Sequence, residues 1–319
     1  GGVPAHIFSE EALLRELVFK YAEPKDPFDF APSAAAALSR FEPAKWVSGP
    51  ALLSAGAETA VAQLLERTAE PQDAILTLTA NNLPSSTPHI EPVYGTQYGT
   101  LPIRAGAWAR SSSLPLAPPL PNRFLPSDLH IKSRPIGAPV TARGAHPTPT
   151  LLQSSPALRL HHLQDTTFRL PNAHTFFELR SPQFGASAEA SVLSALYADL
   201  LRESLLEETA EAMEAGLEAK IEVDYRGLTI ALSGFNDRMP QLAATICNQI
   251  RHCPLEQPDF DRRRTALLTE LANSYQALPI ERCSYYRGLV LETPQFTVEQ
   301  LEAAASRIRL SDLRGFQRG

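Results

Sequence analysis

Proline is concentrated in one segment, and this segment most constrains how the chain folds. Thirteen of the 28 prolines lie in residues 81–150, which make up about a fifth of the length. Proline has a fixed φ and no backbone N–H, so a proline-rich stretch sustains neither long helices nor central strands. Serine and glycine fill much of the remainder and leave little apolar surface to bury. We therefore predict an extended or partly disordered linker at residues 104–150, with an ordered part on either side.

The part before the linker, residues 1–103, is predicted to contain helices followed by a strand. Apolar side chains recur at helical spacing in FSEEALLRELVFKYA and in ETAVAQLLERTAEP, where we expect Val61, Leu64 and Leu65 to face inward. The run that follows, DAILTLTA, is predicted to be a buried strand. Prolines and alanines break the pattern near residues 22–56, and we interpret this region as a surface insertion.

The part after the linker, residues 151–319, has clearer periodicity. We predict a strand in NAHTFFELRSP, then one helix or two that end at Gly216. A hairpin follows with its turn at Arg226-Gly227. Its alternation places Ile221, Val223, Ile230 and Leu232 toward the helices, and Lys220, Glu222 and Asp224 away from them. Several amphipathic helices follow; the last begins at Ser311, and because the chain stops within it we predict that this domain is truncated. The order predicts an α+β fold, with helices packed on one face of a mixed sheet.

Composition excludes some classes of function. The net charge is −6 and the pI is about 5.8, whereas a nucleic-acid-binding protein shows a basic face. No apolar run approaches 18 residues, so we expect no membrane span. The three cysteines are too few and too scattered for a disulfide scaffold. They fit free thiols in a reducing compartment, so we expect an intracellular protein.

Several stretches, in this order, resemble the insulin-degrading enzyme (insulysin) and pitrilysin family of zinc metalloproteases. HIFSEEALLREL and ETAVAQLLERTAEPQDAILTLTA resemble the end of the family's second domain, and YGTQY resembles its Tyr-Gly-Thr-x-Tyr segment, although Val93 stands where insulysins commonly have Trp. LPNRFLPSDL resembles a Pro-Asn-x-Phe segment. RLHHLQDTTFRLPNAHTFFELRSP, LLRESLLEETAEAMEAGL and LTIALSGFNDRMPQLAATICNQI resemble the third domain. The resemblance spans most of the chain except the regions near 22–56 and 105–118.

This resemblance implies four related αβ-sandwich domains in two halves, which enclose a chamber around a peptide. The chain would hold the end of the second domain, the linker between halves and most of the third domain. Its partners would be the remaining domains and the peptide substrates of the parent. A short segment would anchor the linker without taking part in catalysis: Tyr94, Gly95, Thr96, Gln97 and Tyr98. An ordinary Gly-Tyr turn explains the same residues equally well.

The family's chemistry depends on a His-x-x-Glu-His helix that binds zinc, and this motif is absent. None of the eight histidines is next to a glutamate. Glu299-Gln300-Leu301 matches the first three residues of the family's Glu-Gln-Leu-Gly-Tyr motif in the fourth domain. However, Glu302 stands in place of the glycine and no tyrosine follows. We therefore predict no catalytic, cofactor-binding or metal-binding residue here, and expect zinc in the parent enzyme. The alternative is a complete, inactive binding or scaffold protein of the same fold.

Other candidate residues have ordinary structural explanations. His161, His162 and Asp165 suggest a metal cluster, but neighbouring strand residues point to opposite faces. His174 and Glu178 are four apart on a predicted strand and so lie far apart along it. We predict that Arg262–Arg264 form a solvated helix face. Pro118–Pro121 are predicted to be a plain linker rather than a polyproline ligand, and Cys247 and Cys253 to be packing thiols.

Overall fold

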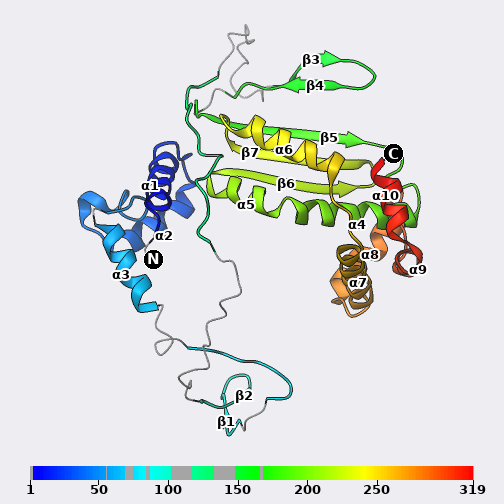
Figure 1. Ribbon diagram of the computed structural model, residues 1–319, viewed down its shortest axis with the longest axis horizontal. Helices are drawn as coiled ribbons and strands as arrows, with labels where there is room; N and C mark the ends of the chain where they lie inside the picture. The colour runs from blue at the N-terminus through cyan, green and yellow to red at the C-terminus, as the bar shows by residue number, and fades with distance from the viewer. Residues whose placement is uncertain are drawn as a thin grey trace. The chain divides into compact units, whose positions relative to one another are not determined.

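The computed structural model describes residues 3–54, 56–68, 75–83, 87–101, 117–132, 148–165 and 168–318. It divides into two compact units (Figure 1). The first unit is Gly1–Phe19 with Lys25–Pro121, and the second is Lys20–Pro24 with Asn122–Gly319. Most of the regular structure lies in the second unit.

The first unit is built from short helices and one small hairpin. The helices are α1 (Ala5–Lys20), α2 (Pro27–Leu38), the 3₁₀ helix η1 (Pro43–Lys45) and α3 (Ala57–Thr68); the strands are β1 (His89–Ile90) and β2 (Gln97–Tyr98). Helix α2 lies inside the region that we interpreted as a surface insertion, and most of its residues are exposed. It forms because the Asp26 side chain accepts a hydrogen bond from the Phe28 N–H (2.8 Å), Pro27 fits the first turn and a run of alanines follows.

Two predictions for this unit are wrong. Helix α3 forms as expected, but Val61, Leu64 and Leu65 are 41%, 58% and 49% exposed rather than buried. The described residues of the expected strand, 75–80, form no strand, and its apolar side chains are also exposed: Ile75, Leu76 and Leu78. An apolar run becomes a strand only when a partner strand takes up its backbone hydrogen bonds, and none is present among the described residues here.

The second unit contains a three-stranded sheet of β5 (Asn172–Arg180), β6 (Leu217–Asp224) and β7 (Gly227–Phe235), in the order β5-β7-β6 (Figure 1). Strands β6 and β7 form the predicted hairpin, and Ile221 pairs with Ile230. Ile221, Ile230 and Leu232 are buried and Val223 is half-buried. The opposite face of β6 is exposed, as predicted: Lys220, Glu222 and Asp224.

Among the described residues of this unit, seven helices accompany the sheet. They are α4 (Ala188–Ser204), α5 (Leu206–Glu214), α6 (Met239–His252), α7 (Gln257–Ser274), α8 (Pro279–Leu291), α9 (Val298–Arg307) and α10 (Leu310–Arg318). The predicted helical stretch before the hairpin is therefore two helices. Helix α5 ends just before Gly216, which adopts a positive φ of 76° that favours glycine.

The core of the second unit lies between the sheet and these helices. Apolar side chains at helical spacing in α4, and in the residue that follows it, are almost fully buried there: Val192, Leu196, Leu200 and Leu205. Phe260 from α7 and residues of α6, α9 and α10 complete the cluster. The α+β class is confirmed, and all pairs among the described strands are antiparallel rather than mixed.

A separate two-stranded hairpin precedes the main sheet. It consists of β3 (Thr150–Ser154) and β4 (Arg159–His162), and nearly all of its side chains are exposed. Among the described residues, no helix combines the length and apolar character that crossing a membrane requires.

Candidate functional site

The segment predicted to anchor the linker, residues 94–98, forms the turn and the second strand of a small hairpin made of β1 and β2. The Glu91 carboxylate accepts hydrogen bonds from the N–H groups of Tyr94 (2.7 Å) and Val93 (2.9 Å). These two N–H groups hold the pKa of Glu91 below its ordinary value. Gly95 has a φ of 68°, which closes the turn. The glycine and the glutamate thus explain the shape of the turn through local hydrogen bonding.

The tyrosine rings of this hairpin face outward. Tyr94 is 88% exposed and Tyr98 is 49% exposed, with the Tyr98 ring 5.3 Å from the His89 ring. Thr96 and Gln97 lie between them, Gln97 in β2. An anchor needs a surface against which these rings pack, so the anchoring role stays a prediction.

The histidines singled out by the sequence lie on strands. His161 and His162 are adjacent in β4, and His162 is the less exposed of the two. His174 and Glu178 both lie on the outward face of β5. Within the described parts of the chain, no group of three or more His, Cys, Asp or Glu residues is placed to hold a metal ion. The described residues therefore do not fit a zinc site.

The cysteines are unpaired. Cys247 and Cys283 are exposed, whereas Cys253 is buried with its Sγ 3.6 Å from the Ser204 Oγ. Burial raises the pKa of the Cys253 thiol, which keeps it protonated and unreactive near neutral pH. Cys253 is thus a packing thiol, as predicted, but the same prediction is wrong for Cys247, whose position on α6 is exposed.

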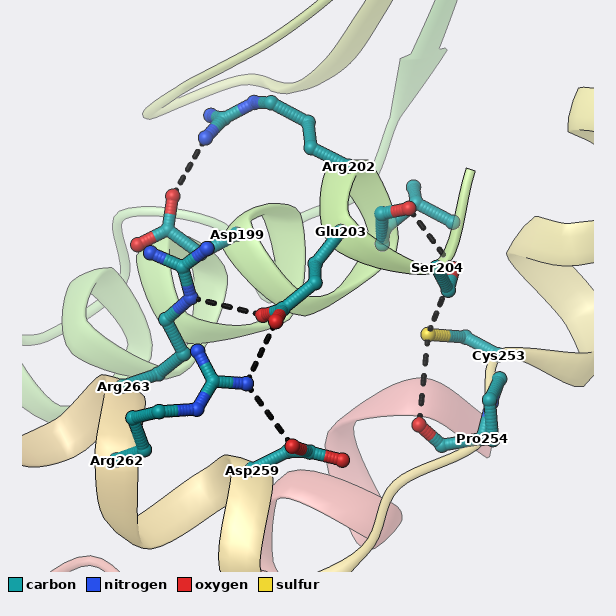
Figure 2. Close-up of polar contacts among 10 residues, drawn as sticks. Asp199, Arg202, Glu203, Ser204, Cys253, Pro254, Asp259, Arg262 and Arg263 are labelled. Carbon is teal, nitrogen blue, oxygen red and sulfur yellow. Dashed lines mark hydrogen bonds and ion pairs between the residues drawn. The ribbon is translucent and has the colours of Figure 1, made fainter. Parts of the chain in front are cut away.

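An ion-pair network joins helices α4 and α7 (Figure 2). The Glu203 carboxylate accepts hydrogen bonds from Arg262 Nη2 (2.6 Å) and Arg263 Nε (3.0 Å), and Arg262 also contacts Asp259 (2.9 Å). The two arginines lower the pKa of Glu203. We predicted a solvated helix face at Arg262–Arg264. Arg262 is exposed, but Arg263 and Arg264 are half-buried. Arg262 and Arg263 connect α7 to α4 through Glu203, and Arg264 donates to the Ile308 carbonyl (3.2 Å).

A further group of contacts was missed by the sequence reasoning. Residues 122–128 lie within the predicted linker, yet they are docked on the second unit. Phe124 is fully buried in its core, and the Asn122 side chain donates to the Glu211 carbonyl (2.7 Å). The Arg123 N–H and Nε both bind the Glu211 carboxylate (2.8 and 3.0 Å). Asn122 also accepts from the Phe124 N–H (2.8 Å), a local Asn turn that was visible in the sequence.

Asp237 holds the other end of this docked segment. Its carboxylate accepts hydrogen bonds from the Ser127 N–H (2.8 Å), the Ser127 hydroxyl (3.1 Å) and the Asp128 N–H (3.1 Å). Arg238 donates to the Leu125 carbonyl (3.3 Å). The Ser127 N–H makes the largest contribution to lowering the pKa of Asp237, followed by the Asp128 N–H. The ionised carboxylate therefore stabilises the docked segment.

We expect docking to weaken in acid. Because the pKa of Asp237 is lower in the folded state, its contribution is complete above the ordinary value of about 3.9 and is lost as the pH falls through the lowered value. Asp237→Asn should reduce the free energy of unfolding at pH 7 by about 1–2 kcal/mol, the cost of weakening charge-assisted hydrogen bonds. It should also flatten the dependence of stability on pH below about 5. Urea unfolding at several pH values measures both.

The matched control is Asp259→Asn, which removes a carboxylate from an exposed ion pair. Its expected effect is below about 0.5 kcal/mol. Equal effects of the two variants would contradict a specific role for Asp237.

The outward face of the main sheet is not covered by the core. Along β5 it presents Phe176, which is 70% exposed. On β6, Lys220 Nζ lies 2.6 Å from the Glu222 carboxylate. Beside it is a hollow of about 300 Å³, lined by Arg202, Glu222, Val223, Asp224 and Thr229. This arrangement offers charged and aromatic contacts to a ligand, but no nucleophile paired with a base.

Comparisons with known proteins identify relatives along almost the whole chain. Residues 19–304 match a family model described as the middle or third domain of peptidase M16. "Insulin-degrading enzyme-like 2" of Arabidopsis thaliana is 25% identical over 319 residues, which cover 99% of this chain and 32% of the relative. The human "Insulin-degrading enzyme" is 23% identical (97% of this chain, 30% of the relative), and the "Nardilysin" of Pongo abelii 27% (99% and 27%).

A solved structure shares the fold. The crystal structure of pitrilysin matches with a TM-score of 0.71 over 99% of this chain and 33% of that chain, at 17% sequence identity. This chain spans about a third of the length of its curated relatives. With the family model matched over most of the chain, the chain belongs to the peptidase M16 family, in which it corresponds to the middle or third domain.

Proposed function

We propose that this chain is the non-catalytic middle segment of an insulysin-like zinc metalloendopeptidase. In this role it forms part of the wall of the substrate chamber and the linker between the two halves. The match of residues 19–304 to the middle or third domain of peptidase M16 carries the proposal. The partners would be the remaining domains of the enzyme and its peptide substrates, in an intracellular compartment.

The distribution of side chains supports a wall. The helices and the inward residues of the sheet share one core, which leaves the outward face of β5, β6 and β7 free to meet a substrate. The docked residues 122–128 support the linker role, because they fix the end of the linker on the second unit through Phe124 and Asp237. The proposed domain limits are 1–103, 104–150 and 151–319.

Zinc belongs, in this proposal, to parts of the enzyme outside this chain. The test is to express the coding sequence that extends beyond both ends and to measure bound zinc and peptide cleavage. We expect one zinc per polypeptide and cleavage that a chelator abolishes. Replacing His161, His162 and His174 together by alanine should change neither, because these histidines are not ligands.

Two outcomes would contradict the proposal. Loss of zinc in the triple variant, with the fold intact by circular dichroism, would place ligands in this chain. An extended polypeptide without zinc or cleavage would instead support an inactive binding or scaffold protein.

A further inference from the structure

Strand β6 forms one edge of the main sheet, with β7 on its other side (Figure 1). The Ser181 N–H donates to the Arg226 carbonyl and the Asn236 N–H donates to the Pro171 carbonyl. These two bonds determine which residue pairs of β5 and β7 are hydrogen-bonded to each other and which are not. Hydrogen-bonded and non-bonded pairs alternate in antiparallel sheets. Main-chain groups of four β6 residues must therefore point away from the sheet: Leu217, Ala219, Ile221 and Val223.

One side-chain hydrogen bond confirms that the Ile221 carbonyl points away from β7. Arg202 of α4 donates from Nε to the Ile221 carbonyl at 3.0 Å, and its Nη1 pairs with Asp199 (Figure 2). Among the described residues, no hydrogen bond is made to the outward main-chain groups of Ala219 and Val223. The main-chain groups at the edge of β6 are thus unbonded on either side of the contact made by Arg202. Such an edge is a template for the addition of another strand.

The side chains next to this edge define what would pair with it. The outward face of β6 carries three acidic residues and one basic residue: Glu218, Lys220, Glu222 and Asp224. Lys220 pairs with Glu222 (2.6 Å) and Arg226 of the turn pairs with Asp224 (3.2 Å), so this face and the turn together keep one net negative charge. A strand added to β6 places every second side chain directly across from these residues. Opposite charges in such cross-strand positions are stabilising and like charges are not. The hollow of about 300 Å³ beside Glu222 and Asp224 leaves room for a long side chain.

We propose that the free edge of β6 binds an extended peptide with lysine or arginine at alternate positions. The peptide adds as a fourth strand and bonds to the main-chain groups of Ala219, Ile221 and Val223. A peptide N–H takes the place of Arg202 Nε at the Ile221 carbonyl. Arg202 therefore occupies the Ile221 carbonyl when no peptide is present, and the peptide displaces it on binding.

This inference deepens the proposed function, since it names a site on the chamber wall and the class of peptide that it takes. It concerns binding by this chain alone, without zinc or hydrolysis. Failure of peptide binding would leave the zinc and cleavage results of the extended polypeptide untouched, and failure of those results would leave the binding result untouched.

The test uses the 319-residue chain and a fluorescent, capped peptide of alternating lysine and valine, with fluorescence anisotropy as the readout. N-methylation at one alternate set of residues removes the N–H groups that face β6, and methylation at the other set does not. We expect one set to weaken binding at least about tenfold and the other to leave it within about twofold. A peptide with glutamate in place of lysine should also bind at least about threefold more weakly.

Protein variants test the position of the site. Ala219→Pro removes an N–H from the free edge but not from the ladder to β7, and should weaken binding about tenfold. Arg202→Met removes the hydrogen bond that competes with the peptide for the Ile221 carbonyl, and should strengthen binding about fivefold. The control is Arg180→Met on β5, which removes another exposed arginine that is paired with a carboxylate, Glu178, and should have no effect.

Thermal unfolding establishes that each variant is folded. Equal effects of the two methylated sets, or unchanged binding to a folded Ala219→Pro variant, would overturn the proposal. Self-association of the chain that competes with the peptide and is lost in Ala219→Pro would also overturn it, because a second copy would then occupy the edge.

Discussion

Replacing Phe124 by alanine is expected to lower the free energy of unfolding of the second unit by about 3–5 kcal/mol. Phe124 has no exposed surface, and its ring lies in the same core cluster as residues of α4, α6 and the sheet. Truncation removes the transfer energy of the ring and leaves a cavity that the surrounding helices cannot fill. The size of this effect is unusual for a residue in a proline-rich tract.

The variant should also release the docked segment. Limited proteolysis of the unmodified chain is expected to cut first within residues 104–150, outside the docked residues 122–128, or in residues 22–56. In Phe124→Ala we expect new cuts within residues 122–128, because their backbone loses its anchor. Leu120→Ala is the matched control: Leu120 lies in the same tract, is 86% exposed and should change stability by less than about 0.5 kcal/mol. Equal unfolding curves for the two variants would contradict the docking.

The second large effect concerns activity. The purified 319-residue chain is expected to bind no stoichiometric zinc and to cleave no peptide. A catalytic zinc takes three protein ligands and one water, and the His-x-x-Glu-His motif that the family resemblance calls for is missing from the sequence. Without the metal, this family's route to a hydroxide-like nucleophile near neutral pH is lost.

The second unit was largely predictable because its signals are local. Strict alternation in the hairpin places Ile221 and Ile230 in the core, and helical spacing does the same for Leu196. The Thr297 capping box forms as its sequence indicates, with the Thr297 N–H donating to the Gln300 side chain (2.9 Å). Local periodicity and burial agree in these elements, so pattern and structure coincide.

The first unit and the docked segment were less predictable because their structure depends on contacts distant in sequence. Ile75 lies in an apolar run that reads as a strand, but it is 96% exposed where no described strand pairs with it. Phe124 shows the reverse, since only its distant partners in the second unit make it a core residue. The proposal that the sheet forms part of a chamber wall comes from the family resemblance. The free edge of β6 follows from the strand order and the hydrogen-bonding pattern, which the sequence alone does not show.

The most direct test of the central claim is a metal analysis of the purified chain together with a quenched-peptide assay, each with and without added zinc. The account predicts no stoichiometric zinc and no cleavage above background under either condition. One tightly bound zinc per chain, together with cleavage that a chelator abolishes, would contradict it. That result would direct the search for zinc ligands in this chain to His161, His162 and His174.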